Sequence, residues 1–195
     1  MSKLSHYAVD TRASQFTVQA FASGLISVVA HSPKLAIRDW SGEVQFNASN
    51  FQEPSLRVKI RAASLEVLDE LTDRDRHELH RVMNQDVLET ATFPNISFDS
   101  CEVTAVRTRE DLFRIQILGN LTLHGVTNQQ PLIAQVAVGV DSLRAYGEFT
   151  VLQSDYGVKI ASIAGGTLRL RDELKCSFYV VARRQQEKAV ASTAR

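Results

Sequence analysis

Apolar and polar residues alternate one by one in segment after segment of this chain, and that alternation restricts the fold more than any other feature. In residues 143–151 (LRAYGEFTV) every second residue is apolar or glycine, and residues 15–20, 56–62 and 113–117 repeat the pattern. Successive side chains of a β-strand point to opposite faces, so each segment has one dry face and one wet face. Strands of a parallel sheet would read as continuous apolar runs. The sequence therefore predicts a mainly β, antiparallel fold.

An antiparallel sheet with one dry face must cover that face and its edges, and closure into a barrel does both. A barrel of about eight strands is either filled by its own side chains or holds one small, elongated ligand. Small residues at dry positions, such as Ala20, Ala62 and Ala145, hint at a cavity. The same mixture of large and small residues also packs a filled barrel, and Gly147 has a further explanation as a β-bulge. Both interiors remain open at this point.

One segment, residues 71–88, has helical instead of strand spacing. Its apolar residues are Leu71, Leu79, Val82, Met83 and Val87. Thr72 is a suitable N-cap for this segment. We therefore expect one or two short helices inserted between strands. The chain has no linker-like stretch and no fixed repeat, which predicts a single barrel domain over residues 1–183 and a flexible C-terminal tail over residues 184–195.

Charge and cysteine content exclude several classes of function. The chain has 22 Lys and Arg residues and 22 Asp and Glu residues, interleaved along its length, so charge gives no reason to expect a nucleic-acid partner. No apolar run is long enough for a transmembrane segment or a secretory signal. Cys101 and Cys176 both fall in strand-like segments, which favours a pair of buried thiols over the alternative, a disulfide. These features predict a cytoplasmic protein.

Three histidines are candidates for a chemical role. His77 and His80 are three residues apart, whereas the zinc-protease helix needs a spacing of four, and no third ligand follows. We therefore expect no metal site and no cofactor. His31 is a candidate for a hydrogen bond to a ligand's headgroup at a barrel mouth, with a structural role as the alternative.

Several ordered blocks of the sequence resemble the YceI-like family. Residues 119–127 (GNLTLHGVT), followed by Pro131, are similar to a strand and turn of the form G-x-L-T-L-H-G-V-T. Residues 93–100 (FPNISFDS) resemble the block that follows a short helix in the family. The blocks at residues 7–16, 64–67 and 156–158 also fit in order and approximate spacing, so the resemblance spans Tyr7 to Arg183.

The resemblance implies a lipocalin-like barrel and, as in some relatives, a long apolar cavity that holds a polyisoprenoid chain. His124, which belongs to the first motif block, is interpreted as a hydrogen-bonding brace beside Gly125 and not as a catalyst. Strand phase assigns ligand binding to the dry-face residues, together with His31. These residues are Phe16, Val18, Val44, Phe46, Val58, Ile60, Ile96, Phe98, Ile115, Ile117 and Phe149. A single bulge would move a set of them to the other face.

The leading hypothesis is the binding, carriage or sequestration of an isoprenoid or other lipid chain inside the barrel, without catalysis. One alternative is a small hydrolase or isomerase that uses His31 as its acid or base. Another is a filled barrel that acts only through its surface, as a homodimer.

Overall fold

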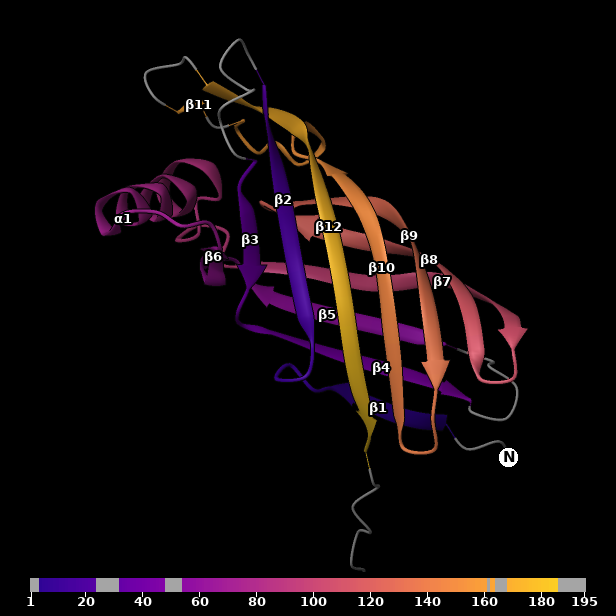
Figure 1. Ribbon diagram of the computed structural model, residues 1–195. Coiled ribbons are helices and arrows are strands. Elements are labelled where there is room, and N and C mark those ends of the chain that lie inside the picture. The colour runs from indigo at the N-terminus through magenta and orange to yellow at the C-terminus, as the bar shows by residue number, and fades with distance from the viewer. Residues whose placement is uncertain (1–3, 24–31, 48–53, 161, 164–167, 186–195) are drawn as a thin grey trace, which may run out of the picture.

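Antiparallel strands make up most of this computed structural model, which describes residues 4–23, 32–47, 54–160, 162–163 and 168–185 (Figure 1). Burial alternates in step with the sequence: along Leu112–Leu123, every second residue from Phe113 to Leu123 is buried. The strands in these ranges are β1 (Leu4–Val9), β2 (Gln15–Ser23), β3 (Lys34–Ile37), β4 (Trp40–Asn47), β5 (Ser55–Arg61), β6 (Leu65–Val67), β7 (Asn95–Arg109), β8 (Leu112–Leu123), β9 (Val126–Val138), β10 (Ser142–Leu152), β11 (Ser162–Ile163) and β12 (Leu168–Arg184).

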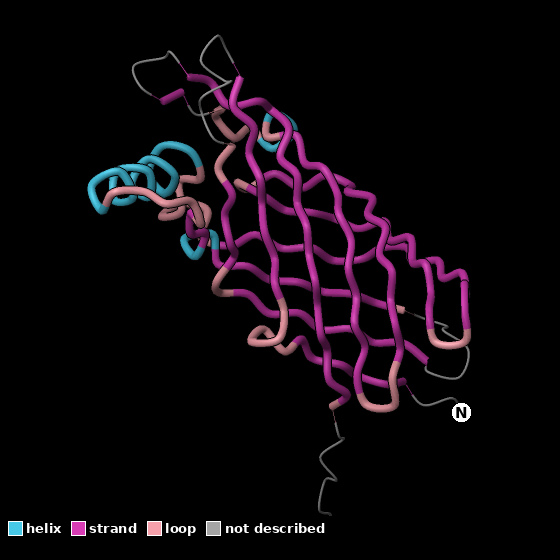
Figure 2. Tube along the Cα trace, viewed as in Figure 1, coloured by secondary structure: helices cyan, strands magenta, loops and turns pink. Residues whose placement is uncertain are grey.

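Eight of the described strands close into a barrel in the order β1-β4-β5-β7-β8-β9-β10-β12, because β1 pairs with β12 as well as with β4. All of these pairings are antiparallel, and Figure 2 shows the strands crossing in two layers around one interior. The prediction of an antiparallel β-barrel is confirmed. β12 extends to Arg184, one residue past the predicted domain boundary.

The two ends of the barrel differ. At one end, called the closed end here, β2 pairs with β12, β3 with β2, and β6 with β3. This is the end beside the helix (Figure 1). At the other end, called the mouth, the chain turns between β7 and β8 at residues 110–111 and between β9 and β10 at residues 139–141. The extra strands β2, β3 and β6 therefore extend the sheet only in the half of the barrel beside α1.

The predicted helix lies between β6 and β7. α1 (Asp73–Val82) continues into a π-helical turn, η2 (Met83–Val87), and short 3₁₀ turns form at η1 (Ala62–Ser64) and η3 (Ser154–Tyr156). Thr72 caps α1 as predicted: its Oγ1 accepts a hydrogen bond from the Asp75 amide at 3.2 Å. On the inner side, Leu79, Met83 and Val87 pack against the core. None of the helices within the described ranges is long and apolar enough to cross a membrane.

Two of the sequence blocks that carry the resemblance, residues 93–100 and 119–127, lie on the neighbouring strands β7 and β8. Phe98 of β7 packs its ring over Gly119 of β8, where an added Cβ would lie 2.7 Å from Phe98 Cε2. Phe93 does the same at the β8–β9 turn, where a Cβ on Gly125 would lie 2.6 Å from Phe93 Cε1. Because each glycine lacks a Cβ, an aromatic ring of the other block packs directly against its backbone.

His124 is held by ring packing, and the predicted hydrogen bond from its side chain is not formed with any of the described residues. Its ring lies 4.3 Å from the Phe93 ring, and its backbone has a φ of +52°. Nε2 is buried, and no partner among the described residues forms a hydrogen bond with it. The nearest acidic group is Glu89, whose Oε2 lies 3.6 Å away and whose Oε1 faces Lys159 Nζ at 3.3 Å. His124 therefore joins the β8–β9 turn to the segment after η2.

Both cysteines are free thiols, but only Cys176 is buried. The expectation of two buried thiols is wrong for Cys101. The register of β7 against β8 shifts between Ser100 and Glu102, which leaves Cys101 as the extra residue of a bulge with an exposed side chain.

We expect only one thiol per folded chain to react with a thiol reagent at neutral pH, and two after denaturation. Burial raises the pKa of Cys176 to about 12 and disfavours its reactive thiolate, whereas Cys101 is exposed. Labelling followed by mass spectrometry measures this, with Cys101→Ser as the control that abolishes the rapid reaction. Rapid labelling of Cys176 in folded protein would contradict the core packing described above.

Candidate ligand-binding cavity

An apolar cavity of about 170 Å³ lies inside the barrel, between the closed end and the mouth. All eight barrel strands contribute to its wall, and every lining residue is apolar except Ser55 and Ser97. A dry cavity of ~150 Å³ lined by Leu, Ile and Phe is known to hold a molecule the size of benzene. The barrel interior is therefore not completely filled, and the open space suits an apolar group.

The cavity is elongated along the barrel. On β9 its lining runs from Leu132 to Val138, and on β10 from Leu143 to Phe149. Six residue steps along a strand extend about 20 Å. A compact pocket of the same volume would be much shorter, so the cavity is long and narrow. This shape fits a thin chain better than a bulky ring system.

Aromatic rings bound the cavity toward the closed end. The Phe16 ring contacts Trp40, Phe149 and Phe178 with centroid distances of 6.0, 6.3 and 6.4 Å. Gly147 makes room for this cluster: a Cβ there would lie 2.7 Å from Phe178 Cζ. β10 pairs without interruption through this position, so Gly147 does not mark a bulge.

Near the mouth the wall is held by a second, smaller cluster. The Tyr7 ring stacks on the Phe46 ring at 5.2 Å with planes 8° apart, and both pack with Leu143 and Ala182. This cluster therefore supports the wall where β1, β4, β10 and β12 meet near the mouth.

The structure brings ten of the twelve sequence-predicted ligand residues to the cavity wall. Val18 is not among them: it is buried in the core cluster, paired with Cys176 and Leu35 closer to the closed end. His31 lies outside the described residues. The residues at the wall are Phe16, Val44, Phe46, Val58, Ile60, Ile96, Phe98, Ile115, Ile117 and Phe149.

Sequence reasoning missed part of the wall on β7 and β9. On β7 the bulge at Cys101 changes the phase, so the inward residues are Ile96 and Phe98 before it and Val103 and Ala105 after it. On β9 the outward-facing residues include the apolar Ile133, which is 43% exposed. Apolar residues on both faces make the inward face of β9 hard to recognise from the sequence. The register with β8 would have identified the inward residues of both strands.

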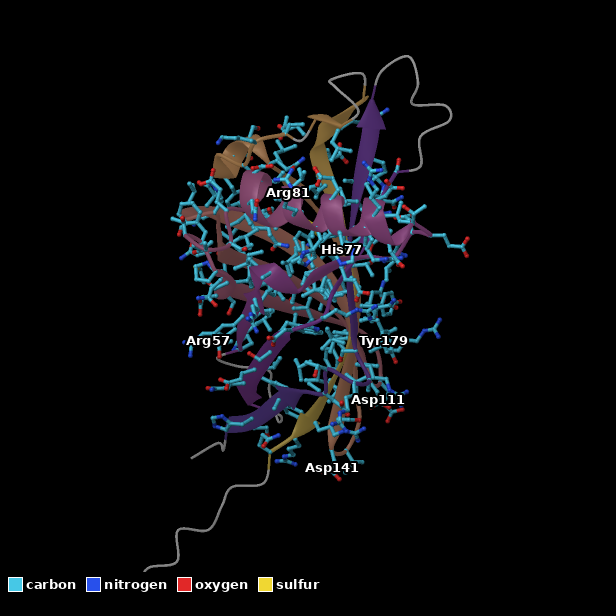
Figure 3. All side chains as sticks on the ribbon, turned by 90° about the vertical axis from the view of Figure 1, so that its left-hand side faces the viewer. Arg57, His77, Arg81, Asp111, Asp141 and Tyr179 are labelled. Carbon is cyan, nitrogen blue, oxygen red and sulfur yellow. The ribbon has the colours of Figure 1, made fainter. Side chains whose placement is uncertain are left out.

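The two histidines with helical spacing lie outside the cavity. His77 and His80 are both exposed on α1, and Figure 3 shows His77 on the side of the molecule that the helix covers. His77 Nδ1 hydrogen-bonds to the carbonyl oxygen of Asp73 at 2.6 Å, and Asn84 Nδ2 lies 3.2 Å from the His80 ring. Within the described ranges, no cluster of three or more potential metal ligands was found.

The family model of the YceI-like domain matches residues 7–182 of this chain. The chain belongs to the YceI-like family. No protein of curated function matches this YceI-like chain.

Solved structures share the barrel at low sequence identity. BcnA from Burkholderia cenocepacia is 18% identical, with a TM-score of 0.66 over 89% of this chain and 98% of its own. A polyisoprenoid-binding domain from Saccharophagus degradans is 14% identical, with a TM-score of 0.64 over 94% and 100%. The Campylobacter jejuni YceI protein is 19% identical, with a TM-score of 0.58 over 81% and 88%. These likenesses establish the fold of the YceI-like chain.

Proposed function

We propose that this YceI-like protein binds a single apolar chain inside its barrel and carries or sequesters it. The observation that carries the proposal is the cavity wall, which is apolar on all eight strands apart from Ser55 and Ser97. Burying apolar ligand surface there is favourable by about 25 cal/mol per Å². A ligand rich in polar groups would lose its hydration without gaining hydrogen bonds in return.

An isoprenoid or another lipid chain is the ligand class that fits best. The cavity is long and narrow, which favours a thin chain over a compact molecule. One structural neighbour is described as a polyisoprenoid-binding domain, which supports the same class for this chain.

Binding is proposed in preference to catalysis. Among the described wall residues the only hydroxyl groups belong to Ser55 and Ser97, and neither lies beside a histidine or carboxylate of the wall. The hydrolase or isomerase alternative rests on His31, which is outside the described residues. It stays a prediction, and loss of a pH-dependent activity in His31→Ala would support it. The cytoplasmic location and the homodimer also stay predictions.

An organic extract of the purified protein is expected to contain an apolar chain molecule in near-stoichiometric amount. Mass spectrometry of the extract identifies it, and a series of masses differing by one isoprene unit would assign an isoprenoid. Protein stripped of lipid by denaturation and refolding serves as the control and should bind an apolar fluorescent probe. A protein that carries no lipid and, once refolded, binds no such probe would contradict the proposed function.

A further inference from the structure

The inner face of β7 ends in a positive charge at the mouth. In the β7–β8 pair, Val103 lies opposite Ile117, Ala105 opposite Ile115, and Arg107 opposite Phe113. The first two pairs line the cavity, so Arg107 is the next inward position toward the mouth. Its guanidinium lies over the Phe113 ring, with Cζ 5.6 Å from the centroid. The side chain thus caps the apolar wall with a cation.

β12 ends in the same way on the opposite side of the barrel. Val180 lines the cavity, Ala182 is fully buried beside Leu143, and Arg184 is the next residue with the same phase. Arg184 Nη2 donates a hydrogen bond to Ser5 Oγ at 3.1 Å, and the Ser5 side chain is buried. In the closed order of strands, β7 and β12 face each other across the interior.

Neither of these guanidinium groups forms an ion pair with a carboxylate in the described part of the chain. By contrast, outward-facing Arg57 pairs with Asp99 at 2.8 Å, and Arg183 pairs with Asp10 at 2.9 Å. A guanidinium has five N–H donors. Arg107 uses Nε and Nη2 to bind the Glu110 carbonyl, at 3.0 and 2.6 Å, and Arg184 uses one donor for Ser5. Both arginines therefore keep donors for another acceptor.

The acidic residues of the mouth lie in the turns and not on the inward face. Glu110 and Asp111 occupy the β7–β8 turn, and Asp141 occupies the β9–β10 turn. Figure 3 shows Asp111 and Asp141 at the end of the molecule away from α1. The carbonyl of Asp141 accepts a hydrogen bond from the Arg184 amide at 2.8 Å, which fixes the backbone there. Arg107 and Arg184 therefore lie on the same strand faces as the cavity-lining residues, whereas the acidic residues lie in the turns beyond the strands.

We propose that the ligand is an amphiphile with one anionic headgroup, a carboxylate or a phosphate, which lies at the mouth against Arg107 and Arg184 while its chain fills the cavity. This inference rests on the proposed function. Apart from the hydroxyl groups of Ser55 and Ser97, the described wall residues offer no polar partner and no counter-charge, so a charged head is favoured at the mouth. Guanidinium groups bind carboxylates and phosphates through charge-assisted, often bidentate hydrogen bonds.

Calorimetric titration with decanoate, decyl phosphate and decanol tests this with one chain length and three headgroups. The lipid-free wild type should bind at least one of the two anionic probes more tightly than decanol. Arg107→Gln combined with Arg184→Gln should weaken that anionic probe about tenfold and leave decanol within about twofold, as expected for hydrogen bonds to a charged group. The single variants show which arginine contributes more.

Arg114→Gln combined with Arg144→Gln is the matched control. Both residues are exposed on the outer face near the mouth, so this variant removes the same charge without changing the inward face. It should retain the preference for the anionic probe. Equal affinity of the wild type for all three probes, or equal weakening in the control, would overturn the inference and leave the cavity function standing. If none of the probes binds, the cavity function itself fails.

Discussion

Gly119→Ala is expected to lower the free energy of unfolding by about 2 kcal/mol, the middle of the range for overpacking a dense core. The added Cβ would lie 2.7 Å from Phe98 Cε2 and 2.8 Å from the Asp99 carbonyl oxygen. Phe98 is only 7% exposed, so its ring has little room to move. Denaturant unfolding measures the loss, and the melting temperature should fall by about 4–8 °C for a domain of this size.

A double-mutant cycle with Phe98→Leu tests whether the Phe98 ring causes the loss. Leucine removes the ring atoms that meet the new Cβ, so the double variant should be more stable than the sum of the single effects predicts, by about 1 kcal/mol. Gly139→Ala is the matched control, because a Cβ there would lie 3.3 Å from the Ser142 carbonyl oxygen in the β9–β10 turn. Additive single effects, or equal losses at Gly119 and Gly139, would contradict this packing.

Ala145→Phe is expected to abolish lipid binding while changing the free energy of unfolding by less than about 1 kcal/mol. Ala145 lies on the cavity wall between Val136 and Val180, which also line it. A phenyl ring is about as large as the benzene that a cavity of ~150 Å³ accepts, and this cavity measures about 170 Å³. The new ring would therefore occupy the space of the ligand. Lipid extraction and thermal unfolding of the ligand-free proteins measure the two effects.

The same substitution at Ala182 is the control for filled space. Ala182 has no exposed surface and packs with Tyr7, Phe46 and Leu143. Ala182→Phe should overpack that cluster and cost about 1–3 kcal/mol. If Ala145→Phe is destabilised as strongly and the wild type carries no lipid, the barrel is filled and the carrier function must be abandoned.

Local features of the sequence were sufficient for the fold class and for most of the candidate site. The alternation in β8 and β10 predicted which side chains face inward, because the strand period is strictly two wherever no bulge intervenes. The Thr72 cap and the helical spacing predicted α1, because a helix cap and helical periodicity involve only residues that are close in sequence. Strand phase alone placed ten of the predicted residues where the structure has the cavity wall.

Other properties depend on contacts between distant segments. The barrel closes because β12 pairs with β1, which lies more than 170 residues away in sequence. Val18 has the inward phase of Phe16, yet β3 and β12 place it in filled core. Cys101 became exposed through a bulge that is defined only by the register of β7 against β8. A residue's face follows from its neighbours in the chain, whereas the volume left inside the barrel and the charges that meet at its mouth depend on side chains from every strand at once.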